Sequence, residues 1–308
     1  MASKLLLSLL DEAKCMETIR SMRWPNGVRC PKCNSERFWV DREEEPKLQY
    51  RCCECNHWWT DLSGTIFEWT HLLISYWLLA LDWFRQGKSA LAVAKELGIN
   101  RHTAERMHRL LQEELWINRC GEKLSGITEA DEVYIACGKK GIKQKDRKPR
   151  KRGLKQRGRG TAETDKPPVI GVVERENCEI RLEVCPNATK QTCHEVIEKH
   201  IEPGSTLNTD DWCGYKGLDE KGFEHQTVCH SQGEYARDDD GDGINEVHEN
   251  TMEGIWSLLR QWLRTYRGVR KMYLYLYVNA FEFFHNMKRK VSDTLYSLLH
   301  NLVTVHGI

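Results

Sequence analysis

The sequence predicts an α/β core that follows two smaller N-terminal modules. Three observations lead to this prediction. Four cysteines near the N-terminus form two Cys-x2-Cys pairs, a helical pattern of apolar residues follows them, and the second half alternates strand-like with helix-like segments. The chain has 308 residues, of which 40% are hydrophobic, so it is long enough to fold into about two or three domains.

The overall composition argues against several classes of protein. The net charge is only +1, so any affinity for nucleic acid must come from local blocks of charge. The thirteen cysteines are an odd number, and the first residues lack a strongly basic segment and a small-residue cleavage site, so we expect a reducing, cytosolic setting. The most apolar run, residues 72–84, is interrupted by Asp82 and is shorter than the roughly 20 residues of a membrane-spanning helix. We therefore expect no membrane segment.

The first two segments predict a helix and a metal-binding module. Residues 1–23 have the apolar spacing of an amphipathic helix, and residues 24–66 are rich in Cys, Trp, Pro and Gly. Two Cys-x2-Cys pairs in this second segment are separated by eighteen residues. Two such pairs complete a tetrahedral thiolate shell, which suits Zn²⁺ and leaves no coordination position open for catalysis. The expected zinc ligands are Cys30, Cys33, Cys52 and Cys55, with Cys53 as a rival in the second pair.

Residues 67–118 predict a helix-turn-helix. Leu91, Ala94 and Leu97 have helical spacing, a Gly-Ile turn follows, and Asn100 is a suitable N-cap for a second helix. An ordinary helical hairpin explains the same pattern and remains an alternative. In the DNA-binding interpretation, the second helix presents to a major groove the side chains of Arg101, His102, Glu105, Arg106 and Arg109.

Residues 139–159 form a strongly basic segment with twelve Lys or Arg residues and one acid, Asp146. A segment of this composition cannot bury a core, so we expect an arm. The arm would contact DNA phosphates without reading the base sequence, and Lys151 and Arg152 are among the expected contacts.

The segments on either side of the basic arm predict the α/β core, residues 124–290. The expected strands are residues 127–136, 168–174, 178–185, 206–209 and 226–230, and the expected helices are residues 189–200 and 215–221, followed by two longer helical stretches. This order fits an RNase H-like fold, in which helices flank a mixed five-stranded sheet. Residues 291–308 are expected to form a helical tail.

Three acids that are far apart in the sequence lie at positions from which their side chains could converge on one site. Asp131 lies midway along the first strand, among residues that suit a buried central strand, where a carboxylate is costly unless something compensates it. Asp210 ends the fourth strand, at the carboxyl edge where such sheets place their sites. Glu253 opens the helix after the fifth strand. If the three converge, they can hold two Mg²⁺ or Mn²⁺ ions about 3.5 to 4 Å apart.

The pattern leaves an alternative open at each of these positions. Glu132 and Asp211 are rivals of their neighbours, because strand alternation alone does not say which of two adjacent acids faces the metal. Glu253 follows Asn250 by three residues, so it also suits the acidic partner of a helix-capping arrangement.

At these residues the chain resembles the zinc-ribbon insertion-sequence transposases of the DDE superfamily. The resemblance covers nearly the whole chain and is carried by the motifs RWPNGVRCPKC (23–33), SGTIF (63–67), LGINRHTA (97–104), DEVY (131–134), TDDWCGY (209–215) and NTMEGIW (250–256). It implies Asp131 and Asp210 as the first two catalytic acids, and Glu253, or secondly Asn250, as the third. It also implies a basic residue further along the same helix, and Arg260, seven residues after Glu253, fits.

Residues 238–249 also match the EF-hand calcium loop, including Gly243 at the sixth position. However, Asn245 occupies the eighth position, where an EF-hand normally has an aliphatic residue, and no amphipathic helix precedes the loop. The resemblance implies an Asp- and Gly-rich loop before the helix that carries the third carboxylate. We therefore expect a polar turn, with a structural calcium ion as the alternative.

The resemblance implies a transposase. We expect the chain to bind the terminal inverted repeats of an insertion sequence and to catalyse two-metal-ion cleavage and transfer of DNA strands. Its expected partners are element ends, target DNA and further copies of the chain, because two ends must be joined, and its expected location is the cytoplasm, at the nucleoid. The alternative is a non-catalytic regulator that uses only the zinc ribbon and the helix-turn-helix. A zinc- and calcium-stabilised interaction protein is a third interpretation.

Overall fold

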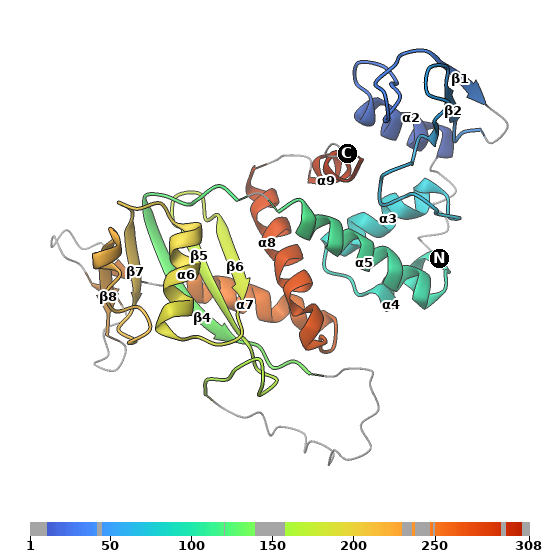
Figure 1. Ribbon diagram of the computed structural model, residues 1–308. Helices are drawn as coiled ribbons and strands as arrows, with labels where there is room; N and C mark the ends of the chain where they lie inside the picture. The colour runs from blue at the N-terminus through green and yellow to red at the C-terminus, as the bar shows by residue number, and fades with distance from the viewer. Residues whose placement is uncertain are drawn as a thin grey trace. The chain divides into compact units, whose positions relative to one another are not determined.

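The computed structural model describes residues 11–41, 45–119, 121–138, 158–229, 236–237, 247–248, 250–290 and 294–303 (Figure 1). Residues 139–157 of the expected basic arm, with Lys151 and Arg152, lie outside these ranges, as do residues 238–246 and 249 of the Asp-rich segment, so the predictions for both remain predictions. The chain divides into two compact units, of which one comprises residues 1–117 and 291–308 and the other residues 118–290.

The first unit contains a small three-stranded antiparallel sheet with an aromatic core. Its strands are β1 (Phe38–Asp41), β2 (Gln49–Cys52) and β3 (Trp58–Thr60), and helix α2 (Glu12–Arg23) precedes them. Tyr50 and Trp59 are buried, and their rings stack with centroids 5.3 Å apart. The fully buried carboxylate of Asp61 accepts hydrogen bonds from the Arg20 guanidinium and the Tyr50 hydroxyl, each at 2.7 Å. Asp61 therefore ties α2 to the sheet.

The same unit contains the helical pair that the sequence predicts. Its helices are α3 (Ile74–Arg85), α4 (Ala90–Leu97), α5 (Arg101–Ile117) and α9 (Thr294–Val303), which contacts α2. Ser89 caps α4 with its side chain, Gly98 ends that helix at a left-handed φ of 68°, and Asn100 accepts a 2.8 Å hydrogen bond from the first turn of α5. The sequence placed Leu91 on the apolar face, but Leu91 is exposed and Val93 is buried in its place.

The second unit is built on a mixed five-stranded sheet, as predicted. The strands are β4 (Ile127–Tyr134), β5 (Pro168–Glu174), β6 (Ile180–Val184), β7 (Thr206–Asp210) and β8 (Glu224–Val228), in the spatial order β6-β5-β4-β7-β8. β4, β5 and β6 are antiparallel neighbours, whereas β7 runs parallel to both β4 and β8. A two-residue ladder joins β9 (Ala236–Arg237) to β10 (Val247–His248).

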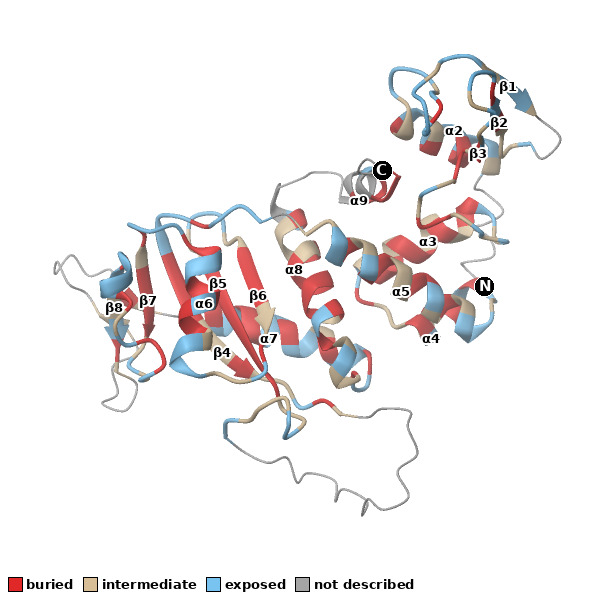
Figure 2. Cartoon of the chain, viewed as in Figure 1, coloured by how far each residue is buried: buried red, intermediate tan, exposed pale blue. Residues whose placement is uncertain are grey.

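Helices cover both faces of this sheet, and each face has its own hydrophobic core (Figures 1 and 2). The helices are α6 (Lys190–His200), α7 (Asn250–Thr265) and α8 (Leu274–Lys290). The core with α6 contains Ala130 of β4, and the core with α7 and α8 contains Val133 of the same strand. Successive residues of β4 therefore face different helices.

Several boundaries differ from the sequence prediction, and positive φ angles explain two of the differences. The expected helix 215–221 is only a single 3-10 turn, η1 (Asp219–Lys221), because Gly217 and Gly222 on either side adopt positive φ angles of 84° and 87°. β6 starts at Ile180 instead of residue 178, because Cys178 has a left-handed φ of 50°. β8 lies two residues earlier than expected.

Membrane-spanning helices are not found in the part of the chain that the structure describes, because none of its helices is long and apolar enough to cross a bilayer.

Candidate active site and zinc centre

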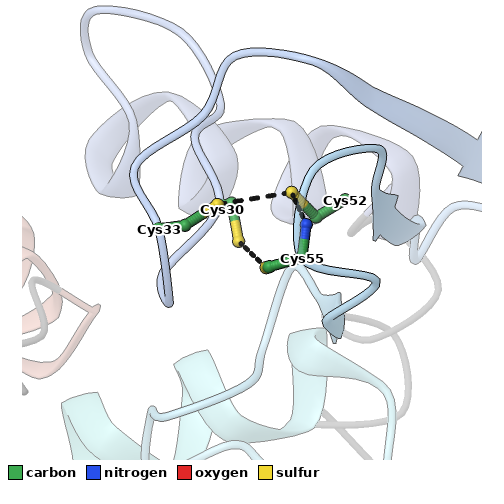
Figure 3. Close-up of side chains that lie close together, drawn as sticks. All are labelled: Cys30, Cys33, Cys52 and Cys55. Carbon is green, nitrogen blue, oxygen red and sulfur yellow. Dashed lines mark hydrogen bonds between the residues drawn. The ribbon is translucent and has the colours of Figure 1, made fainter.

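The four predicted zinc ligands converge at the end of the small sheet (Figure 3). The sulfur atoms of Cys30 and Cys55 lie 3.6 Å apart, and those of Cys33 and Cys52 lie 3.4 Å apart. Four thiolates around a tetrahedral Zn²⁺ at about 2.3 Å would lie about 3.8 Å from one another. The quartet therefore fits structural zinc, and Cys53, which is exposed, is not part of the cluster.

Backbone amides favour the thiolate form of Cys52. The N–H groups of Cys55 and Glu54 donate to its sulfur at 3.5 and 3.4 Å. These hydrogen bonds, with that from Cys55 contributing most, lower the pKa of Cys52 to about 6. A knuckle turn that offers N–H donors to a thiolate is suited to hold a cation beside it.

Asp131 and Glu132, the two adjacent acids that the sequence left as rivals, lie on opposite faces of β4. Asp131 faces α7, where its Oδ2 accepts a 2.8 Å hydrogen bond from the indole nitrogen of Trp256. Glu132 faces the other way and accepts a 2.8 Å hydrogen bond from the hydroxyl of the buried Tyr215. Asp131 is thus the acid on the side of the helix that carries Glu253.

Asp210 lies beside Asp131 on the neighbouring parallel strand. The register pairs Glu129 with Asn208, and two further residues along both strands bring Asp131 next to Asp210. The Asp210 carboxylate accepts a 3.1 Å hydrogen bond from the backbone N–H of Trp212, which turns the chain away after β7. Asp211 is exposed, and its carboxylate lies 3.1 Å from the sulfur of Cys229.

Glu253, Asn250 and Arg260 all lie on α7 and are exposed. Asn250 is the first residue of the helix, and Glu253 and Arg260 are seven residues apart, so they share one helix face. Met252 and Trp256 point to the sheet and are buried. One side of α7 thus packs against the sheet, and the other side presents polar groups to solvent.

The electrostatics couple these acids to one another. Burial raises the pKa of Asp131 to about 6, the hydrogen bond from Trp256 opposes this shift, and the negative charges of Asp210 and Glu253 add to it. Burial, followed by the charge of Asp131, raises the pKa of Glu132 to about 7. A cation beside Asp131 would favour its charged form, because a positive charge offsets both the burial of this carboxylate and the repulsion from Asp210 and Glu253.

Gly171 is a site residue that sequence reasoning missed. It pairs with Asp131 across β4 and β5, and a Cβ atom there would collide with the side chains of Met252 and Trp256. Gly171 therefore lets α7 approach the sheet closely at the level of Asp131. The available signal was a glycine inside the apolar run of β5, which often marks such a close approach.

The second helix of the helix-turn-helix presents the polar side chains that the sequence predicts. Arg101, His102 and Arg106 are exposed, and Arg109 is half-buried. Glu105 forms an ion pair with Arg101 at 2.8 Å on the same surface. Contact of these residues with DNA remains a prediction.

Comparison with known proteins places the chain in one family. The model of the ISXO2-like transposase domain matches residues 123–286, and the transposase zinc-ribbon domain matches residues 10–58. An uncharacterized protein in transposable element ISH50 of Halobacterium salinarum is 31% identical over 286 residues, which cover 92% of this chain and 94% of that protein. A solved structure of the simian T-cell lymphotropic virus intasome, in complex with PP2A regulatory subunit B56 gamma, was also matched. The match covers 65% of this chain and 66% of that chain, at 12% sequence identity and a TM-score of 0.29. The family matches and the ISH50 protein show that the chain belongs to the ISXO2-like transposase family, with a zinc-ribbon domain before its DDE transposase domain.

Proposed function

We propose that this chain cleaves and joins DNA strands at the ends of an insertion sequence, with Asp131, Asp210 and Glu253 holding a pair of divalent cations. The observation that carries the proposal is the position of Asp131 and Asp210 on adjacent parallel strands, against which α7 packs with Glu253 in its first turn. The membership in a transposase family supports the same chemistry.

The donor set fits Mg²⁺ or Mn²⁺. Carboxylate oxygens are preferred ligands of both ions. Within the described ranges, only the cysteine quartet brings three or more ligand atoms within 4.8 Å of one another, so the three acids are more widely spaced than the shell of one ion. We propose that the acids instead share two ions about 3.5 to 4 Å apart. When bound, the pair would supply an activated attacking oxygen and stabilise the leaving oxygen of the phosphodiester.

The protein residues position the reacting groups. Trp256 holds the carboxylate of Asp131, and the backbone N–H of Trp212 holds that of Asp210. Arg260, two turns beyond Glu253 on the same face, is placed to bind a DNA phosphate. Asn250, at the start of the helix, is the second candidate for the third ligand.

DNA recognition is assigned to the first unit and the basic arm. The zinc ribbon and the exposed Arg101, His102 and Arg106 of α5 would contact the terminal inverted repeats, while Lys151 and Arg152 of the arm would contact phosphates. Because two element ends must be joined, the working form is a homo-oligomer on DNA, located at the nucleoid.

A strand-cleavage assay tests this function. The full-length protein is mixed with a duplex that carries the terminal sequence of its own element, with Mg²⁺, Mn²⁺, Ca²⁺ or a chelator in parallel. We expect cleavage at the element end with Mg²⁺ or Mn²⁺ and none with the chelator. Specific binding of the duplex without cleavage under every condition would favour the non-catalytic regulator.

Substituting Gly171 with Ala should disturb the packing of α7 against the sheet beside Asp131. The added methyl group overlaps Met252 and Trp256, and overpacking of this kind costs about 1 to 3 kcal/mol. We expect a lower melting temperature and slower cleavage, because α7 must move away from Asp131. Gly254→Ala is the matched control, since a Cβ there meets nothing within 4 Å and alanine favours a helix. Wild-type stability and cleavage rate in Gly171→Ala would contradict the close-approach role.

The raised pKa of Asp131 predicts that Asp131→Asn stabilises the metal-free fold at neutral pH. The pKa of Asp131 is 3.8 in the unfolded reference and about 6 in the fold, so the folded state binds the proton more tightly. Stability from this group is therefore complete below about pH 4 and is lost as the pH rises through 6. The loss amounts to about 2 to 3 kcal/mol at pH 8, since one pKa unit is 1.36 kcal/mol.

Urea unfolding without added divalent metal measures this effect. The Asn variant should be the more stable protein at pH 8, and the difference should vanish near pH 4. Added Mg²⁺ should stabilise the wild type more than the variant. An Asn variant that is less stable than the wild type at pH 8 would contradict the assigned electrostatics.

A further inference from the structure

The second unit contains a buried carboxylate that the proposed chemistry does not use. Glu129 of β4 is fully buried, and its Oε1 accepts hydrogen bonds from Arg175 Nε at 2.7 Å and from the Thr251 hydroxyl at 2.8 Å. Its Oε2 accepts the backbone N–H of Met252 at 2.9 Å. Both oxygens are therefore engaged, and two of these three donors belong to the first turn of α7, while the ring nitrogen Nδ1 of His248 lies 3.3 Å from Oε1.

Through these contacts, Glu129 of β4 accepts a hydrogen bond from a backbone N–H group in the first turn of α7. The first N–H groups of a helix have no acceptor within the helix, and the helix dipole favours a negative charge beside them. Glu129 supplies both, although it is more than 120 residues away in the sequence. Arg175 adds a further contact, because a second nitrogen of its guanidinium donates to the carbonyl oxygen of His248, just before α7. We call Glu129 and Arg175, with these contacts to the start of α7, the clamp.

The clamp connects two of the proposed metal ligands. Glu129 and Asp131 are two residues apart on β4 and face the same side, and Met252 immediately precedes Glu253. β4 is therefore tied to α7 at two points one turn apart, through Glu129 at Met252 and through Asp131 at Trp256. Movement of the first tie would shift Glu253 relative to Asp131.

Stability alone does not account for a buried ion pair here. Burying two charges costs solvation energy, and apolar replacements of buried pairs are often neutral or stabilising. The Glu129 carboxylate does provide a defined direction, because one oxygen accepts from the Arg175 guanidinium and the other from the backbone at the start of α7. The benefit of this pair is the position that it imposes on α7.

We propose that Glu129 is a positioning residue that, together with Arg175, sets the distance between Glu253 and the two strand-borne acids and so governs the affinity for the divalent cations. This inference rests on the proposed function. Glu129 is not one of the proposed metal ligands; it acts through the backbone of α7.

The test measures Mn²⁺ binding to the zinc-loaded full-length protein by electron paramagnetic resonance, with Mn²⁺ alone as the probe. Glu129→Gln keeps the side-chain shape but replaces one acceptor oxygen with an amide donor, so it cannot serve all three partners. We expect Mn²⁺ affinity to fall by about tenfold or more, as for other residues that orient metal ligands. Cleavage should then require correspondingly more Mn²⁺, while its maximal rate with saturating metal changes less.

Glu282→Gln is the matched control. Glu282 is also buried, pairs with Arg119 at 2.8 Å and accepts one backbone N–H, that of Leu182, at 2.6 Å. It lies on α8, and its carboxylate accepts from Arg119 and from Leu182 of β6, so its substitution should lower the melting temperature without changing Mn²⁺ affinity. Equal loss of Mn²⁺ affinity in both variants would mean a general effect of destabilisation and would overturn the inference.

Thr251 provides a milder pair of variants should Glu129→Gln fail to fold. Thr251→Val removes one donor to Glu129, whereas Thr251→Ser retains it. We expect weaker Mn²⁺ binding in the Val variant and wild-type binding in the Ser variant. Wild-type Mn²⁺ affinity in a folded Glu129→Gln variant, or in Thr251→Val where Glu129→Gln does not fold, rejects the positioning role of Glu129 alone. A wild-type protein with no Asp210-dependent Mn²⁺ uptake rejects the proposed function itself.

Discussion

Replacing Asp210 with Asn should reduce metal-dependent strand cleavage by about a thousandfold and leave binding to the element ends unchanged. The estimate follows because a metal ion contributes several kcal/mol to transition-state stabilisation, and each 1.36 kcal/mol is a factor of ten in rate. The variant should fold, since Asn keeps an oxygen that can accept the N–H of Trp212.

The neighbouring acid gives this experiment its control. Asp211 is exposed, so Asp211→Asn should cleave at close to the wild-type rate. Both variants carry the same change of charge at adjacent positions. Cleavage that persists in Asp210→Asn, or that is lost to the same extent in Asp211→Asn, would remove Asp210 from the proposed metal site.

Replacing Cys30 and Cys33 together with Ser should release the zinc and unfold the ribbon. The core around the cysteines has few buried hydrophobic side chains besides Tyr50 and Trp59, so metal binding must supply a large part of its folding free energy. Structural zinc sites are worth about 10 to 16 kcal/mol in small domains. We expect protein without bound zinc, faster proteolysis of residues 24–66 and loss of binding to the element ends.

Cys53→Ser is the matched control for the zinc experiment. Cys53 lies next to a ligand but is exposed and outside the quartet, so its loss should leave one zinc per chain. Atomic absorption of the purified proteins measures the content directly. Unchanged zinc in the double Ser variant would refute the assignment of the ligands.

The fold class was predictable because its signals are local. Paired Cys-x2-Cys motifs, helical spacing and the alternation of apolar runs each depend on neighbouring residues, and the family match and the sheet bear out the result. Prediction failed where glycine or a left-handed residue interrupts the pattern. Gly217 and Gly222 reduce an expected helix to one turn, and Leu91 is exposed although its spacing suits a core.

The details of the candidate site depend on contacts that sequence spacing does not contain. Asp131 and Glu132 are equivalent in a period-two pattern, and only the packing of α7 on one face and α6 on the other distinguishes them. Glu129 offered no local signal, because its partners lie 46 residues away at Arg175 and 122 residues away at Thr251. The role of such an acid can be identified only once the fold shows its partners.

We propose above that Asp131, Asp210 and Glu253 share divalent cations. Anomalous diffraction from crystals of the full-length protein soaked in Mn²⁺ tests it most directly. We expect one or two anomalous peaks at about 2.0 to 2.3 Å from carboxylate oxygens of Asp131 and Asp210, with Glu253 completing the ligands. Peaks that lie elsewhere on the protein, with these three carboxylates bound to no Mn²⁺, would contradict it.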